Sequence, residues 1–170
     1  IVSNRELIKR PGFPSPILPV ISVTSSLINY LFALPILFCV LWWDGTQLTT
    51  AALALPIIMA IQFFFTLGLA YLVATLNVNF RDTEYILSIF LRLTFFLTGI
   101  FFDVTTVVER FFILNFNPML HLVNAYRRIL IFGELPPLSI MAILSLCSIG
   151  LVLLGYFTFK RANHRYVEEL

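Results

Sequence analysis

The residues that could do chemistry in this sequence are mainly charged groups beside long apolar runs. In the stretch NVNFRDTEY, Arg81, Asp82 and Glu84 follow 36 uncharged residues, and Arg92 lies about ten residues further along. If this apolar run crosses a bilayer, a helical rise of 1.5 Å per residue puts Arg92 roughly at mid-membrane. A charge there costs at least ~2.5 kcal/mol on insertion scales. Arg92 must therefore line a polar cavity or a subunit interface, or pair with a group such as Asn29 or Gln62.

Sequence signatures of catalysis are missing. There is no GxxxxGK[ST] phosphate loop, no HExxH pair and no G-x-S-x-G turn. Only Asp103, Glu109 and His121 lie near enough to one interface to serve a membrane-embedded transferase acting on lipid-linked sugars. Cys39 and Cys147 fall inside apolar runs, which argues against a disulfide framework or a metal site. We therefore expect a non-enzymatic chain without catalytic residues, metal or cofactor of its own.

The composition places the chain in lipid. Its 170 residues are 59% hydrophobic and 12% charged, with a mean hydropathy of +0.95, whereas soluble domains carry about 25% charged residues. A chain this short could not bury so much apolar surface in a water-soluble core. The net charge of +2 is too small to indicate nucleic acid. The chain opens on Ile1 without a signal peptide, and we expect it to be the later part of a longer protein.

The apolar runs predict an all-α integral membrane protein with four transmembrane helices, since each crossing needs about 20 apolar residues. The expected spans are residues 20–43, 50–76, 84–102 and 136–159, preceded by segment 1–19 and followed by a tail, 160–170. Segment 103–134 is too polar for one span and too short for two. We expect it to form a re-entrant or interfacial helical hairpin on the outer side, with residues 107–114 as its first arm.

Orientation follows from the distribution of Lys and Arg, which favour the cytoplasmic side. Four spans put both ends of the chain on one side, and that side would hold Arg5, Lys9, Arg10, Arg81, Lys160, Arg161 and Arg165. The other side would hold Arg110, Arg127 and Arg128. Both ends and the Arg81 loop are therefore predicted to be cytoplasmic. Trp42 and Trp43 then lie at the outer interface, beside a tight turn at Asp44-Gly45.

Two predicted cytoplasmic segments have alternative interpretations. In NVNFRDTEY, Asp82 can cap the next helix and Glu84 can complement its dipole, so the loop is either a simple anchor or a docking site for a partner. Ser3 and Glu6 form a capping box for a short helix over about residues 4–9. Four prolines between positions 11 and 19 would connect it stiffly to the first span. This helix either transmits force from a partner or lies on anionic lipid.

The stretch NPMLHLVNAYRRILIFGELPP predicts an amphipathic helix too short to span the membrane. Asn117 is the expected N-cap, Pro118 occupies the first helical position and Gly133 ends the helix. Helical spacing puts Met119, Leu122, Val123, Tyr126, Ile129 and Leu130 on one face, and His121, Asn124 and Arg128 on the other. The helix could lie in the outer leaflet or dip into it.

Aromatic and small residues in the spans suggest further contacts. Phe95-Phe96 and two similar clusters could stack on sugar rings, although most membrane phenylalanines simply pack against helices or lipid. Ala70 and Ala74, one helical turn apart near Gly68, predict close helix packing.

Four motifs in this order resemble the permease subunit of type-two ABC exporters, in particular those for O-antigen, capsule and teichoic acid. They are NRELIKRPGFPSPILP, LNVNFRDTEYIL, FFLTGIFFD and NPMLHLVNAYRRILIFGELP, and they cover nearly the whole chain. The resemblance implies a subunit of six spans, of which this chain would lack the first two. It also implies a homodimer around a central channel in the cell inner membrane, with ATP and Mg²⁺ bound by a separate ATPase subunit.

The resemblance also implies roles for particular residues. The family's coupling helix, which sits in a groove of the ATPase, would correspond to Asn4, Arg5, Glu6, Leu7, Lys9 and Arg10. A second cytoplasmic turn near the same partner would contain Phe80, Arg81 and Asp82. Residues 117–133 would be an outer re-entrant helix narrowing the channel exit. Candidates for contact with the substrate in the channel are Arg92, Phe95, Phe96, His121, Asn124, Tyr126 and Arg128.

The implied function is export of a lipid-linked polysaccharide across the cytoplasmic membrane, driven by the separate ATPase. Two alternatives remain open from the sequence. A permease of the same fold could export a drug or a small lipid, which channel width would reveal. The membrane-embedded transferase named above is the other alternative.

Overall fold

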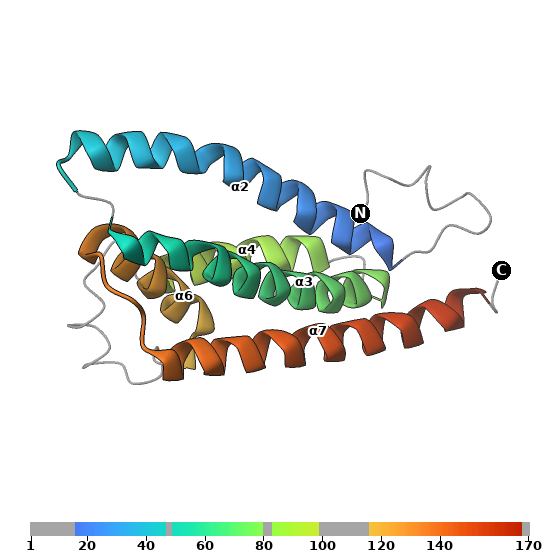
Figure 1. Cartoon of the computed structure of the whole chain (residues 1–170). Helices are drawn as coiled ribbons and strands as arrows, with labels where there is room; N and C mark the ends of the chain where they lie inside the picture. The colour runs from blue at the N-terminus through green and yellow to red at the C-terminus, as the bar shows by residue number, and fades with distance from the viewer. Residues whose placement is uncertain (1–15, 47–48, 80–82, 99–115, 168–170) are drawn as a thin grey trace.

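The computed structural model describes residues 16–46, 49–79, 83–98 and 116–167, and these ranges are helical with no β-strand. The elements in order are α2 (Ile17–Trp43), η2 (Thr50–Ala54), α3 (Leu55–Asn79), α4 (Thr83–Leu97), α6 (Pro118–Arg127), η4 (Arg128–Phe132) and α7 (Leu138–Val167) (Figure 1). Here η2 is a 3-10 turn and η4 a π-helical turn. The all-α prediction is therefore confirmed for the described part of the chain.

Three of these helices are long and apolar enough to cross a membrane: Ile17–Trp43, Thr50–Asn77 and Leu138–Ala162. They correspond to the spans predicted at 20–43, 50–76 and 136–159. α2 begins before residue 20 and includes Pro19, because a proline in the first helical turn sacrifices no hydrogen bond. α7 continues beyond residue 159 to Val167, so most of the predicted tail extends the same helix.

α4 corresponds to the predicted span at 84–102 but is shorter. It has 15 residues, about 22 Å of helix against a hydrocarbon core of about 30 Å. Residues 99–102 and the predicted arm at 107–114 lie outside the described ranges. The fourth span and the outer hairpin therefore remain predictions.

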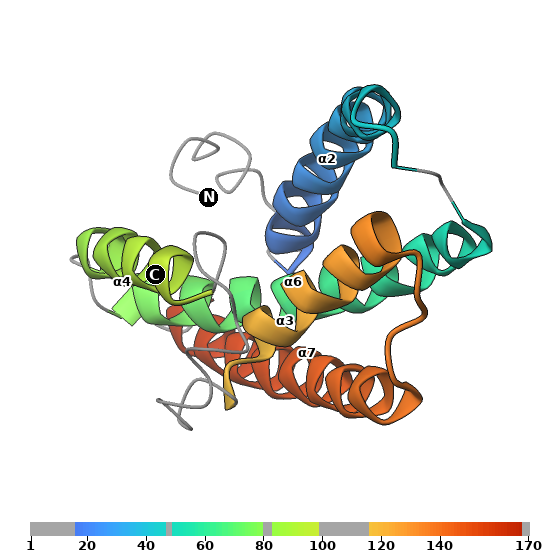
Figure 2. The ribbon, with the colours of Figure 1, turned by 90° about the vertical axis from the view of Figure 1, so that its left-hand side faces the viewer.

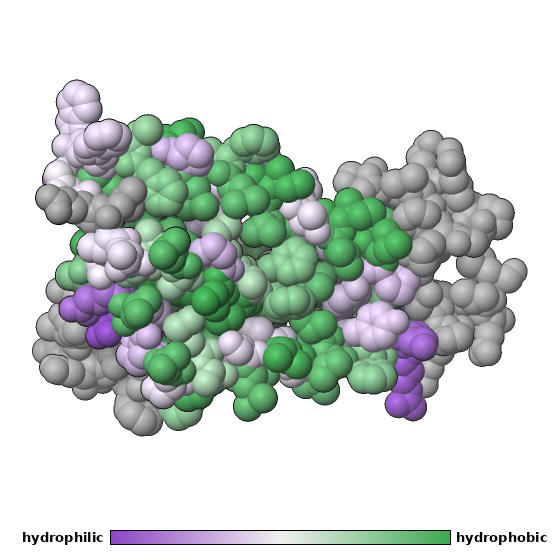
Figure 3. Space-filling view, viewed as in Figure 1, coloured by the Kyte–Doolittle hydropathy of each residue, from purple (hydrophilic) through white to green (hydrophobic). Residues whose placement is uncertain are grey.

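α3 is the central helix, with α2 on one side and α7 on the other (Figures 1 and 2). The start of α2, the end of α3 and the end of α7 lie at one end of the bundle, on the right in Figure 1. The end of α2 at Trp43, η2 and η4 lie at the opposite end. Apolar residues cover the middle of the face in Figure 3, and the most hydrophilic surface lies at its two ends. α2, α3 and α7 therefore run in the alternating directions that the predicted order of spans requires.

The backbones of α3 and α7 lie in direct contact. A Cβ built on Gly68 would lie 2.6 Å from the carbonyl carbon of Leu151, and one on Gly155 would lie 2.6 Å from the Gly68 carbonyl oxygen. Ser148 Oγ donates to the carbonyl oxygens of Leu144, at 2.7 Å, and of Ile61, at 3.2 Å. Small residues allow such an approach between membrane helices. The close packing predicted from Ala70 and Ala74 near Gly68 is confirmed, since Ala74 is buried and Ala70 is partly buried beside the same residues.

Two groups of buried side chains lie along α3. The first, the α6 cluster, joins η2 and α3 to α6, η4 and α7, and consists of Ala51, Ala54, Leu55, Ile58, Ile61, Phe65, Leu122, Ala125, Ile129, Leu130 and Leu144. The second, the Tyr71 cluster, joins α2, α3 and α7, and consists of Val23, Leu67, Tyr71, Ala74 and Phe159. Each cluster therefore connects a different set of neighbours to the same central helix.

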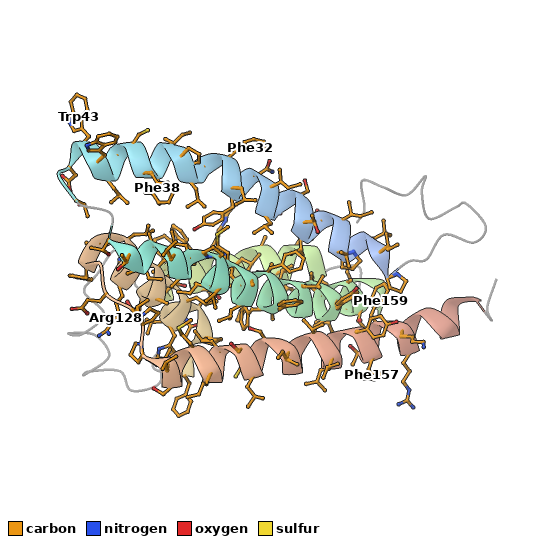
Figure 4. All side chains as sticks on the ribbon, in the orientation of Figure 1. Phe32, Phe38, Trp43, Arg128, Phe157 and Phe159 are labelled. Atoms are coloured by element: carbon orange, nitrogen blue, oxygen red, sulfur yellow. The ribbon has the colours of Figure 1, made fainter. Side chains whose placement is uncertain are left out.

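Large apolar side chains also cover the outside of the bundle. Phe32 on α2 and Phe157 on α7 are 74% and 65% exposed and point away from the other helices, whereas Phe38 and Phe159 point inward (Figure 4). Trp43, at the end of α2, is 94% exposed. The tight turn predicted beside it is present, since Gly45 has a φ of +81° and donates to the Trp42 carbonyl oxygen at 3.1 Å. An apolar exterior of this kind suits a lipid environment.

Candidate functional site

The predicted docking residues Asn4 to Arg10 and Phe80 to Asp82 lie outside the described ranges, so their contacts with a partner remain predictions. The helices next to these two segments in the sequence are described. Pro16 caps the start of α2, and α3 and α4 flank positions 80–82. Thr83 Oγ1 donates to the carbonyl oxygen of Leu76 at 3.3 Å, which ties the first residue of α4 back to α3. The start of α2 and the end of α3 lie at the same end of the bundle (Figure 1).

The helix predicted from Asn117 to Gly133 is present, and its local signals act as expected. Asn117 Oδ1 accepts a hydrogen bond from the Met119 backbone N–H at 3.0 Å, and Pro118 occupies the first helical position. α6 ends at Arg127 and continues as the π-helical turn η4. Gly133, with a φ of +66°, ends that turn, and the Glu134 N–H donates to the Arg128 carbonyl oxygen at 2.9 Å.

α6 and η4 pack against α3 and α7 through buried apolar side chains (Figure 2). Leu122, Ile129 and Leu130 are buried in the α6 cluster, and Met119 packs against it, as the predicted apolar face requires. Val123 is only half-buried, while Leu120, which the helical spacing puts off that face, is 1% exposed. The prediction of a single apolar face was therefore wrong at Leu120, because a second side of α6 is also buried.

A polar contact between α6 and α3 lies beside this apolar packing. The Tyr126 hydroxyl donates to Gln62 Oε1 at 2.6 Å, and the Tyr30 ring of α2 meets the Tyr126 ring edge-on, with centroids 6.1 Å apart. Burial raises the pKa of Tyr126 far above its ordinary value, and the neighbouring Tyr30 adds to the rise. The hydroxyl therefore stays protonated and available as a donor. Gln62, predicted as a partner for Arg92, is instead bound by Tyr126.

The far end of this segment is fixed to η2. Thr49 Oγ1 donates to the Gly133 carbonyl oxygen at 3.1 Å, and a Cβ built on Gly133 would lie 2.7 Å from Thr49 Cγ2. The linker between α2 and α3 thus approaches η4 so closely that a side chain at position 133 would require Thr49 to shift, and the positive φ there also favours glycine. With the Tyr126–Gln62 contact, this gives the α6–η4 segment polar attachments at two points.

The other predicted channel residues of this segment differ in their exposure to solvent. His121 and Asn124 are half-buried on α6. Arg128 is exposed at the same end of the bundle as Trp43 (Figure 4) and lies 4.0 Å from Glu134. Exposed ion pairs of this kind contribute little to stability. Arg128 therefore lies outside the packing that holds Tyr126.

The predicted channel residues of α4 lie away from the α6 segment's polar contacts. Phe95 and Phe96 are 47% and 61% exposed, with ring centroids 5.8 Å apart. Arg92 is exposed as well, and within the ranges that the structure describes it forms no ion pair or hydrogen bond. Neither Asn29 nor Gln62 is its partner. The structure does not gather all seven predicted channel residues into one site.

The described residues form neither a metal site nor a cluster suited to a transferase. No group of three His, Cys, Asp or Glu side chains in these ranges could hold a metal ion, and Cys39 and Cys147 are free thiols. His121 belongs to the α6 segment, whereas Asp103 and Glu109 lie outside the described ranges. What the described arrangement offers is a short helix packed against α3 and α7 by an apolar cluster and a few polar contacts.

Sequence comparison agrees with this architecture. The sequence model of the ABC-2 type transporter family matches residues 12–131, and the chain belongs to that family. It is therefore a multi-pass membrane protein of a transport permease family, which confirms the resemblance stated from its motifs.

Similar proteins narrow the class further. The chain is 30% identical, over its whole length, to the O-antigen export system permease protein RfbA of Myxococcus xanthus. It is 28% identical, over 99% of its length, to each of two proteins of the same name from Klebsiella pneumoniae. The chain spans 66% of the length of each of these relatives. It is thus an ABC-2 permease homologous to O-antigen export permeases.

Proposed function

We propose that this chain is part of the membrane subunit of an exporter that moves a lipid-linked polysaccharide outward across the cytoplasmic membrane. The observation that carries the proposal is similarity along essentially the whole chain to three proteins named as O-antigen export permeases. The helical bundle, with three helices apolar enough to span a membrane, supports it. ATP is hydrolysed by a separate ATPase subunit, and this chain supplies the path and no catalytic group.

In this proposal the bundle end formed by the start of α2, the end of α3 and the end of α7 faces the cytoplasm. Exposed Lys160 and Arg161 at the end of α7 favour that orientation. Residues 4–10, which precede α2 in the sequence, and residues 80–82, between α3 and α4, dock on the ATPase. The opposite end, with Trp43 and the α6–η4 segment, then faces outward.

Two copies of the subunit enclose the path in this proposal. The exposed face of α4, with Arg92, Phe95 and Phe96, contributes to it, because a charge on an apolar helix needs a polar surrounding or a partner. Aromatic faces suit sugar rings, and a guanidinium suits the pyrophosphate of a lipid-linked glycan. The half-buried polar side of α6, with His121 and Asn124, lies nearer the exit.

An export assay in cells tests the proposal. Deleting the gene should preserve total glycan synthesis but leave the lipid-linked glycan on the inner leaflet. A label that cannot cross the membrane should then reach the glycan only in permeabilised cells. The intact gene supplied in trans should restore surface glycan. Normal surface glycan in the deletion strain, or a loss of glycan synthesis itself, would contradict the proposal and favour another cargo or a transferase.

A further inference from the structure

Tyr71 of α3 occupies a position where three helices meet. Its side chain is 5% exposed. The hydroxyl donates to the Pro16 carbonyl oxygen at 3.0 Å, a contact between residues 55 positions apart. Its ring meets the rings of Tyr156 and Phe159 on α7, with centroid distances of 5.9 Å and 5.7 Å. One side chain thus contacts both α2 and α7 from the central helix.

The contact to α7 is rigid because α3 and α7 are closely packed there. A Cβ on Gly155 would lie 2.9 Å from Tyr71 Cβ, so α7 passes directly over the base of this side chain. Phe159 is buried in the Tyr71 cluster, one helical turn beyond Gly155. Moving Tyr71 therefore requires moving α7 with it.

The contact to α2 is made at its N-cap residue, Pro16. Pro16 caps α2, so its carbonyl belongs to the first turn of the helix that directly follows segment 1–15. Leu18, Pro19 and Val23 are the buried residues of the first two turns, whereas later in α2 only Leu34 is buried among the described residues. α2 also diverges from α3 toward Trp43 (Figures 1 and 2). It is therefore held to α3 chiefly at the end next to segment 1–15.

We propose that Tyr71 is the positioning residue through which movement of segment 1–15 reaches the α3–α7 pair. Its hydroxyl holds the first carbonyl of α2, and its ring is fixed against α7, so displacement of the first turn moves all three helices together. Without the hydroxyl, the first turn of α2 can shift or fray while α3 and α7 stay in place. The inference rests on the proposed function, in which residues 4–10 receive the push of the ATPase.

The test compares Tyr71→Phe with a matched control, Tyr156→Phe. Each variant removes one hydroxyl and keeps the ring, but within the described ranges the Tyr156 hydroxyl forms no hydrogen bond. The first readout is amide hydrogen exchange at residues 20–23 in the detergent-solubilised permease, because Pro16 and Pro19 carry no amide hydrogen and the other amides of the first turn have no intrahelical partner. Exchange there should rise about two- to tenfold in Tyr71→Phe, the range that one hydrogen bond supports, and stay at the wild-type rate in Tyr156→Phe.

The second readout is glycan exported per ATP hydrolysed by the permease–ATPase complex in vesicles. Tyr71→Phe should lower this ratio by a similar factor with unchanged recovery of the complex, and Tyr156→Phe should not. Unchanged exchange, an unchanged ratio, or a fall in export explained by lower recovery would overturn the role of Tyr71. If no ATPase accompanies the wild-type chain, the proposed function itself fails. A normal wild-type complex with unchanged exchange in Tyr71→Phe rejects the role of Tyr71 alone.

Discussion

Gly155 of α7 faces the carbonyl oxygen of Gly68 on α3 so closely that a Cβ on Gly155 would lie 2.6 Å from it. Gly150, one and a half turns earlier on α7, has no atom within 4 Å of the same position. The two glycines therefore differ in the space around them while they share one helix. This contrast makes the packing of α3 against α7 testable with a pair of identical substitutions.

Gly155→Ala should destabilise the protein, because the new methyl group must push α3 and α7 apart. Overpacking of this kind costs about 1–3 kcal/mol. Gly150→Ala should be neutral or slightly stabilising, since alanine favours helix over glycine. Reversible unfolding in mixed detergent measures both free energies of unfolding. Equal effects of the two substitutions would show that the close approach is absent.

The hydrogen bond from Tyr126 to Gln62 should appear as an energetic coupling between α6 and α3. Tyr126→Phe and Gln62→Met each remove one partner, and together they leave an apolar pair. Hydrogen bonds between membrane helices contribute about 0.6 kcal/mol on average and at most about 1.7 kcal/mol. A double-mutant cycle on the free energy of unfolding should give a coupling in this range. Strictly additive effects would contradict the contact.

Gly133 and Gly45 offer a second matched pair. Both have positive φ angles, so alanine at either position carries a backbone cost of about 1–2 kcal/mol. Only Gly133 also faces Thr49, whereas the space beside Gly45 is open. Gly133→Ala should therefore cost about 1 kcal/mol more, and adding Thr49→Ala should recover much of that excess. The same unfolding measurement gives both free energies of unfolding. Equal losses of stability for the two glycine substitutions would contradict the η2–η4 contact.

Arg92→Met should lower glycan export while protein level and stability are kept. Arg92 is exposed and unpaired within the described ranges, so its removal breaks no packing there. The loss of a charged hydrogen-bond donor to an anionic substrate predicts a fall of about tenfold or more. Arg92→Lys, which keeps the charge, should retain most of the export. Unchanged export by Arg92→Met would remove this arginine from the transport path.

The parts of this fold that the sequence predicts are those set by local patterns. Apolar run length located the three helices that are long and apolar enough to span a membrane. Asn117, Pro118 and Gly133 marked the ends of the α6–η4 segment, because caps and left-handed glycines act on their own neighbours. The missed features depend on residues far apart in the sequence. No local pattern links Tyr126 to Gln62 or Tyr71 to Pro16, although a tyrosine inside an apolar run does indicate a buried hydroxyl that needs a partner.

The central claim is that this permease works with a separate ATPase that docks where residues 4–10 and 80–82 are predicted to lie. The most direct measurement is copurification of an ATPase with the tagged protein from mild detergent. We expect one ATPase per permease in the wild type, and loss of the ATPase in Glu6→Lys and Arg81→Glu. Lys160→Glu, at the exposed end of α7, serves as the charge-reversal control and should retain the partner. No copurifying ATPase under any mild condition would contradict the account.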